Sequence, residues 1–306
     1  MHKIIAAGLL ALAAASALAT EGGGSAYPVG VETNFTGLML PEGSHLLVYL
    51  QHYQAGQAKD NSGRDNPRFA YFDTQADVMA LRFSQVWPGV RIAGAQVETR
   101  LVMTLPSLDA TLGIARPAPL TPLDRSGHVK GIGDLTFAPV LLGWHGATLH
   151  QMAGMEVILP TGEYERTRNV NLGRNTWQAA ALYGLTWLPG PWEASARLRY
   201  GVNGRNAETD YRSGDELSLE FSAGYKFAPG WSGGLNGYVY RQVSDDIQNG
   251  QSVNGNGNRA SVNALGPYVA YSFSKSAGVV AKWQIESEAK NRAEGQRFWV
   301  QARYMF

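Results

Sequence analysis

The sequence predicts an all-β fold, a transmembrane antiparallel up-and-down β-barrel of about 12 strands with short periplasmic turns and long outer loops. Three features support this prediction: segments that alternate apolar and polar residues, long and short connections that alternate along the chain, and tryptophans beside the short turns. After residue 19, no stretch approaches the ~18 apolar residues of a helical span. A chain that crosses lipid without helices must pair its backbone amides in a closed barrel.

Each expected strand is near the ~9–11 residues that a tilted strand needs to cross a bilayer. The expected strands are 44–55, 75–86, 90–105, 131–143, 148–159, 175–187, 191–201, 215–227, 231–243, 260–273, 278–288 and 296–306. In the last of them, Phe298, Val300, Ala302, Tyr304 and Phe306 share one face. A closing strand with an aromatic last residue is typical of bacterial outer-membrane barrels. We therefore expect Phe306 to be an assembly signal for the barrel-assembly machinery.

The connections support a membrane barrel better than a soluble sandwich, which would also alternate. The gaps after odd strands are long: 56–74, 106–130, 160–174, 202–214, 244–259 and 289–295. The gaps after even strands are short: 87–89, 144–147, 188–190, 228–230 and 274–277. Short periplasmic turns and longer outer loops are typical of outer-membrane barrels. This order places both barrel termini on the periplasmic side.

The short turns carry tryptophans. Trp87-Pro88-Gly89, Pro189-Gly190-Pro191-Trp192 and Pro229-Gly230-Trp231 each place a Pro-Gly pair beside a tryptophan. Proline and glycine suit tight turns, and tryptophan prefers the headgroup level of a membrane. The pattern indicates an aromatic girdle at one rim; ordinary core tryptophans near turns are the alternative.

The beginning of the chain predicts export. Residues 1–19 combine a basic start, an apolar stretch and a small-residue site at Ala17-Leu18-Ala19, as a signal peptide does. A membrane-anchoring helix is the alternative, but the stretch is short for a span. Residues 20–43, rich in Gly and Pro, either hang in the periplasm or plug the lumen, and 44–306 form the barrel. The formal net charge of +1 gives no indication of a nucleic-acid partner.

Four short motifs resemble one family. They are E-G-G-G-S-A-Y-P-V-G at Glu21 to Gly30, L-P-E-G at Leu40 to Gly43, G-x-G-D-L at Gly131 to Leu135, and L-P-T-G-E-Y at Leu159 to Tyr164. With the Phe306 ending, they resemble the family named for the meta-pathway of phenol degradation, which includes sphingosine-responsive outer-membrane proteins. The resemblance implies an outer-membrane barrel that passes aromatic or other apolar compounds. It supplies no binding residue that transfers by position.

The strand faces opposite the apolar ones predict the lumen. The expected pore-lining residues are Glu98, Arg100, Glu156, Glu193, Arg197, Arg199, Glu216, Glu220, Lys226, Lys282, Glu286, Arg297 and Arg303. Their mixed signs fit either a polar pore wall or ion pairs that seal a narrow barrel. Four inward aromatic residues either contact an aromatic solute or fill space: Tyr49, Tyr238, Tyr240 and Trp299.

The function predicted from these features is passive outer-membrane uptake of small aromatic or apolar compounds linked to degradation pathways. Outer-membrane lipid, the assembly machinery and the solute are the expected partners, and no cofactor or metal is required. A structural or adhesive barrel with a blocked lumen is the alternative. A barrel hydrolase is a weaker one, because Ser44 and His45 are adjacent strand residues whose side chains point to opposite faces.

Overall fold

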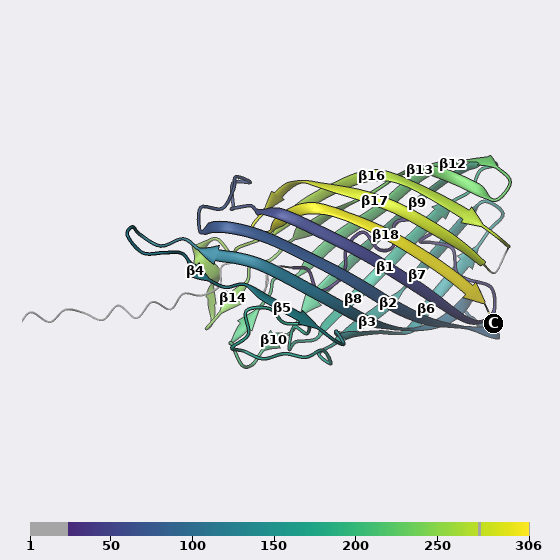
Figure 1. Ribbon diagram of the computed structural model, residues 1–306. Coiled ribbons are helices and arrows are strands. Elements are labelled where there is room, and N and C mark those ends of the chain that lie inside the picture. Colours follow the sequence, from purple (N-terminus) through teal and green to yellow (C-terminus); the bar gives the residue numbers. More distant parts are fainter. Residues whose placement is uncertain (1–23, 275–276, 306) are drawn as a thin grey trace, which may run out of the picture.

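The computed structural model describes residues 24–274 and 277–305, so residues 1–19 and Phe306 lie outside the described part. Twelve antiparallel strands form a closed barrel (Figure 1). They are β1 (Gly43–Ala58), β2 (Phe69–Ile92), β3 (Ala95–Ile114), β6 (Leu135–His145), β7 (Leu149–Leu159), β8 (Gln178–Trp187), β9 (Trp192–Asn203), β12 (Glu216–Ala228), β13 (Trp231–Gln242), β16 (Ser261–Ser272), β17 (Ala277–Lys290) and β18 (Ala293–Met305). Each strand pairs with its neighbours in the chain, and β1 pairs with β18, which closes the ring.

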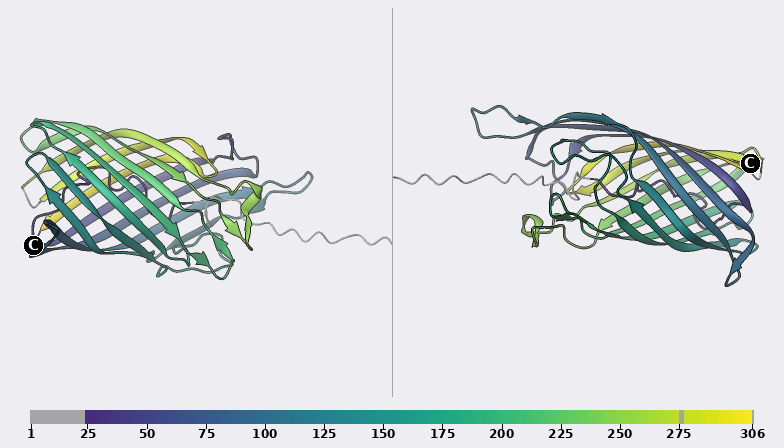
Figure 2. Two further views of the ribbon diagram at one scale, coloured as in Figure 1. Left: turned by 180° about the vertical axis from the view of Figure 1, so that it is seen from behind. Right: turned by 90° about the horizontal axis from the view of Figure 1, so that it is seen from below.

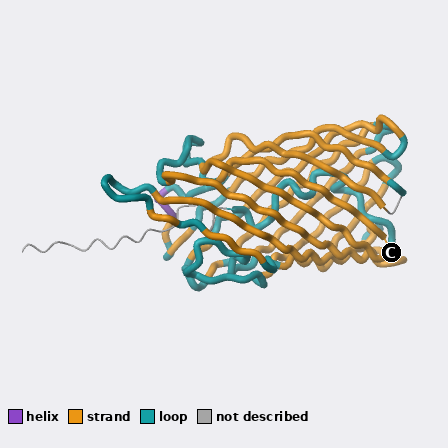
Figure 3. The backbone as a smooth tube through the Cα atoms, viewed as in Figure 1, coloured by secondary structure: helices purple, strands orange, loops and turns teal. Residues whose placement is uncertain are grey.

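The two ends of the barrel differ. The long connections gather at one end, here called the loop end, and the short hairpins lie at the other, here called the turn end (Figure 3). The connections at the loop end carry the remaining short elements: β4 (Leu123–Asp124), β5 (Gly127–Lys130), β10 (Arg205–Asn206), β11 (Tyr211–Arg212), β14 (Ile247–Gln248), β15 (Gln251–Ser252) and the 3-10 turn η1 (Val253–Gly255). In the described ranges no helix is long and apolar enough to cross a membrane.

Every expected strand corresponds to a barrel strand, but two connections differ from the prediction. Residues 87–89 do not form the β2–β3 turn: β2 continues to Ile92, and the turn is Ala93-Gly94, both at positive φ. Pro88-Gly89 instead lies within a register shift between Val86 and Arg91. At this point β2 has more residues than the facing part of β3, as in a bulge, and the chain direction does not reverse. The expected long loop 289–295 is a two-residue turn at 291–292, since β17 and β18 extend past the predicted ends.

The prolines within strands behave differently. Around Pro139 the register of β6 shifts against both β3 and β7, as expected for a residue that cannot donate to a ladder. Pro267 keeps the register, pairing with Leu235 of β13, and no shift occurs between Leu265 and Tyr268 on the β17 side. A proline in a strand of this barrel therefore does not by itself predict a bulge.

The outside of the barrel is apolar and exposed. Large apolar side chains point outward on all sides, among them Leu50, Met79, Phe83, Leu198, Leu219, Leu235, Val269, Ile285 and Phe298. Near the turn end, aromatic rings touch: Trp192 lies 4.8 Å from Tyr225, and Trp231 lies 4.6 Å from Tyr271, between ring centroids. An apolar band bordered by aromatic residues is the exterior that a lipid-facing barrel wall requires.

Residues 24–42, here called the lumen segment, run inside the ring of strands, and Figure 2 shows this purple chain within the barrel. Its contacts give its direction. The carbonyl of Ser25 accepts from Arg174, in the loop-end connection before β8, at 2.9 Å. Glu42 accepts from Arg91, next to the β2–β3 hairpin at the turn end, at 2.7 Å. The lumen segment therefore traverses the barrel from the loop end to the turn end before β1 begins.

Candidate functional site: the barrel lumen

Three ion-pair networks occupy the inner wall, and the first lies on β2 and β3. Glu98, fully buried, accepts from Arg82 and from Arg100, each at 3.0 Å. Arg82 also donates to Glu32 of the lumen segment at 3.0 Å. The carboxylate of Glu98 therefore holds two guanidinium groups, one of which binds the lumen segment.

The second network lies on β7, β9 and β12. Glu156 accepts from Arg199 at 2.6 Å and from Arg197 at 3.4 Å, and Arg197 also pairs with Glu220 at 3.3 Å. The strand register produces this arrangement, because Glu220 lies directly opposite Arg197 on the inward face. Opposite charges directly across an antiparallel pair interact favourably.

The third network is centred on Glu286 of β17. It accepts from Arg297 at 3.2 Å and from the hydroxyls of Tyr238 and Tyr53 at 2.6 and 3.0 Å. Arg292 lies 3.8 Å away. Buried ion pairs add little net stability, but losing one partner leaves an uncompensated charge that costs about 3–5 kcal/mol. Each network therefore adds little net stability while intact, but its members depend on one another for a counter-charge.

The lumen segment is bound along its length by barrel side chains. In its middle, Lys282 donates to the carbonyl of Val31 at 2.7 Å and to the hydroxyl of Thr33 at 3.0 Å. Gln284 donates to the carbonyl of Gly30 at 3.0 Å, and the amide of Gly30 donates to Glu220. Side chains of the barrel wall therefore provide the hydrogen-bond partners for backbone amide and carbonyl groups of the lumen segment that form no secondary structure.

Nearer the turn end, hydroxyl groups hold the lumen segment. The amide of Phe35 donates to Ser195 at 3.0 Å, and the amide of Gly37 donates to Thr186 at 2.9 Å. The hydroxyl of Thr36 donates to the carbonyl of Ala196 at 2.9 Å. Met39 then packs into a buried apolar cluster with Val86, Ala138, Leu141, Met152 and Leu182.

The last residue of the lumen segment is tied to the turn end. Hydrogen bonds from the Arg91 side chain and the Gly89 amide hold the pKa of the half-buried Glu42 carboxyl below its usual range. The carboxylate therefore remains an ionised acceptor for Arg91 at neutral pH.

Two glycines let the lumen segment approach the wall. Gly30 has φ +93°, and a Cβ there would lie 2.3 Å from Gln284 Oε1 and 2.8 Å from the Tyr238 ring. A Cβ on Gly37 would lie 2.4 Å from the carbonyl oxygen of His150 and 2.6 Å from the amide nitrogen of Thr186. Only glycine fits at these two points of contact.

Most of the residues expected to line the pore are buried inside the barrel. They are Glu98, Arg100, Glu156, Glu193, Arg197, Arg199, Glu216, Glu220, Lys282, Glu286 and Arg297. Lys226 is exposed near the turn end of β12, and Arg303 is half-buried, so neither joins the networks. The four expected aromatics, Tyr49, Tyr238, Tyr240 and Trp299, are also buried. Tyr49 donates to Glu32 at 3.2 Å, and the indole of Trp299 donates to Gln284 at 3.1 Å.

Several lumen residues were not predicted. Arg82 lies on the same inward face of β2 as Ser84 and Val86, so the period-2 pattern of the strand is enough to predict its position. Gln284 likewise alternates with Lys282 and Glu286 on β17. Tyr27 and Glu32 belong to a segment without periodicity, so no sequence signal predicts which side chains of the lumen segment reach the wall.

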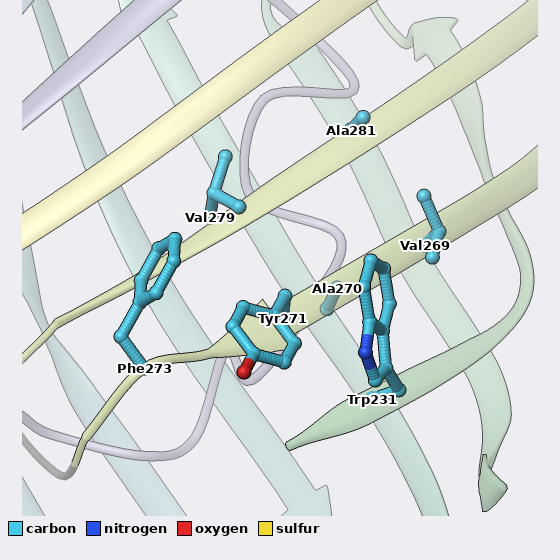
Figure 4. A pocket seen from close by; sticks show the side chains of 7 residues that line it. All are labelled: Trp231, Val269, Ala270, Tyr271, Phe273, Val279 and Ala281. Atoms are coloured by element: carbon cyan, nitrogen blue, oxygen red, sulfur yellow. The ribbon is translucent and has the colours of Figure 1, made fainter. Parts of the chain in front are cut away.

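Outside the lumen, the barrel has an apolar hollow of about 570 Å³ near the turn end (Figure 4). Trp231, Tyr271 and Phe273 flank it, and Val269, Val279 and Ala281 form its floor. Its place on the lipid-facing exterior separates it from the polar lumen. Across the described ranges, no three His, Asp or Glu residues are grouped as a metal site requires.

The fold and this lumen define an outer-membrane β-barrel. The chain belongs to the family described as "Putative MetA-pathway of phenol degradation", whose model matches residues 55–302. No curated protein matches the chain.

Solved structures show the same fold. An outer membrane channel from Pseudomonas putida F1 has 18% identity and a TM-score of 0.73, over 88% of this chain and 97% of that one. The transport unit of the autotransporter AIDA-I from Escherichia coli has 8% identity and a TM-score of 0.53, over 88% and 92%.

Proposed function

We propose that the protein is an outer-membrane channel for passive uptake of small aromatic or apolar compounds, and that the lumen segment is its plug. The observation that carries this proposal is that residues from outside the barrel strands fill the lumen. Barrels of about eight strands are filled by their own side chains, whereas a 12-stranded barrel is wider. Displacing the lumen segment would therefore leave a passage.

The family and the fold support the choice of solute and mechanism. The family is described by phenol degradation, and the barrel from Pseudomonas putida F1 is described as a channel. In this proposal the three ion-pair networks and the buried aromatics Tyr49, Tyr238, Tyr240 and Trp299 form the pore wall. The mixed charges would keep the passage polar without selecting strongly for one ion sign.

The placement of the chain follows from the same proposal. The turn end faces the periplasm and the loop end faces outward, as short turns and long loops do in outer-membrane barrels. Residues 1–19 direct export, Phe306 is read by the assembly machinery, and the apolar exterior contacts outer-membrane lipid. The protein acts without cofactor or catalysis, driven by the solute gradient.

One observation favours a second function. The lumen is filled, and ion pairs join many of its arginines and glutamates, which also suits a structural or adhesive barrel whose activity resides in the loop-end connections. In that case the lumen segment is a permanent part of the core.

Deleting residues 24–38 separates the two functions, because this change leaves every barrel strand in place. Wild-type and deleted proteins are compared in planar lipid bilayers, with heat-modifiable migration as the control for assembly. A plugged channel gives larger and longer-lived conductance after the deletion, and cells carrying it take up phenol faster than sugars. Two silent proteins that are both correctly assembled would instead support the structural barrel.

A further inference from the structure

Tyr27 is the aromatic residue that the lumen segment places deepest in the second ion-pair network. Its ring centroid lies 4.4 Å from the guanidinium carbon of Arg199 and 5.1 Å from that of Arg197. The residue is buried, with 6% of its surface exposed. Guanidinium groups at these distances attract the face of an aromatic ring. The wall therefore holds the tyrosine ring through cation–π contacts.

The hydroxyl of Tyr27 has two different partners. It donates to Glu220 Oε2 at 3.0 Å and accepts from Nη1 of Arg197. A neutral phenolic hydroxyl can do both at once, because it has one donor and free lone pairs. A carboxylate can only accept, and it would meet the Glu220 carboxylate at the same place.

Apolar side chains complete the surroundings of Tyr27. It belongs to a buried cluster that also contains Ile158, Tyr240, Val262 and Ala264. The site thus combines two guanidinium faces, one acceptor, one donor and an apolar wall around a six-membered ring. The side chain of tyrosine beyond its Cβ is itself a phenol.

We propose that the barrel residues around Tyr27 form a binding site for phenols, and that Tyr27 occupies this site as an internal competitor while the lumen segment is seated. This inference deepens the channel proposal by naming the solute class, and it rests on that proposal for displacement of the lumen segment. The barrel residues that bind the phenol are Arg197, Arg199 and Glu220. The para substituent of a bound phenol corresponds to the Cβ of Tyr27, so para-cresol is the matching probe.

The chemistry sets the order of affinities. Toluene has the ring and the methyl group of para-cresol but no hydroxyl, so it leaves Glu220 and Arg197 without that partner. We expect toluene to bind about tenfold more weakly, the usual order for a lost hydrogen bond at a buried group. Benzoate brings a second carboxylate next to Glu220 and is expected not to bind measurably.

The test uses full-length Tyr27→Gly in detergent, because a cavity left by a large buried side chain takes up ring compounds of matching size. Glycine also lacks the Cβ, so the methyl group of para-cresol has room. Calorimetry with para-cresol, toluene and benzoate is compared with the same titrations of wild type, whose micelles control for partitioning. Tyr27→Phe is the matched control, since its ring still occupies the site. The inference predicts one para-cresol site in Tyr27→Gly, at least tenfold weaker binding in wild type and Tyr27→Phe, and the stated order of probes.

Equal para-cresol binding by all three proteins would overturn the inference, since the probe would then bind elsewhere. Equal binding of para-cresol and toluene, or none, by assembled Tyr27→Gly would also overturn it. If Tyr27→Gly does not assemble, deletion of residues 24–30 is titrated in its place with the same criteria. This experiment measures binding and not flux, so it can separate the two proposals. A barrel that binds para-cresol but shows no conductance in planar bilayers would contradict the channel proposal and leave the binding site supported.

Discussion

Gly37→Ala should open the lumen by unseating the segment that fills it. The added methyl would lie 2.4 Å from the His150 carbonyl oxygen and 2.6 Å from the Thr186 amide nitrogen. Both atoms belong to the backbones of paired strands, β7 and β8, which cannot yield without breaking their ladder. The lumen segment must therefore move away from the wall at this point.

The magnitude follows from the contacts that this movement breaks. Three hydrogen bonds lie within two residues of the substitution, from the amide of Phe35, the hydroxyl of Thr36 and the amide of Gly37. Each hydrogen bond contributes about 0.5–1.5 kcal/mol, so their loss weakens the binding of the lumen segment to the barrel wall by about 1.5–4.5 kcal/mol. The ratio of unseated to seated protein should then rise by about tenfold to a thousandfold.

The assay is the open probability of single barrels in planar bilayers, with heat-modifiable migration as a measure of assembly. Gly56→Ala is the matched control, because a Cβ there meets only a carboxylate oxygen of Asp73, at 4.0 Å. We expect raised open probability for Gly37→Ala and wild-type behaviour for Gly56→Ala. An assembled Gly37→Ala barrel with the open probability of wild type would refute the reasoning.

Three further changes test other parts of the structure. Lys282→Met removes both bonds to Val31 and Thr33, so open probability should rise while the barrel stays assembled; unchanged gating would show that this contact does not hold the lumen segment. Glu98→Gln leaves Arg100 without its buried counter-charge, while Arg82 keeps Glu32, and should cost about 3–5 kcal/mol of unfolding free energy in urea titrations, against little change for a substitution of the exposed Lys226. Phe306→Ser should lower the amount of protein in outer-membrane fractions, and normal levels would contradict its role as an assembly signal.

The barrel strands were predictable because each strand carries its own signal. Alternation along β12 and β18 reports the two faces of a wall, and it needs no knowledge of distant residues. Turn position was less predictable, as the β2–β3 hairpin shows. A Pro-Gly pair fits both a turn and a bulge, and the pairing of flanking residues decides between them.

The interior of the barrel was predictable in part. Inward charged residues such as Glu98 and Arg197 follow from strand register, but their partners depend on which strands meet across the lumen. The lumen segment has no period, and its contacts with Lys282 and Thr186 join residues separated by about 250 and 150 positions. Sequence patterning cannot pair residues at such separations, so the sequence leaves open the choice between a periplasmic extension and a plug.

The course of residues 24–42 has a consequence for the order of folding. The lumen segment runs from the loop end to the turn end, and the next residues form β1, whose pairing with β18 closes the ring. If closure came first, this chain would have to be threaded through a finished cylinder from one mouth to the other. A simpler order lets it lie across the open sheet, where Ser195 of β9 and Glu220 of β12 already offer hydrogen-bond partners. In this order the seam between the first and last strands closes around the lumen segment, so the residues that fill the finished lumen would also serve as a template while the wall is being built.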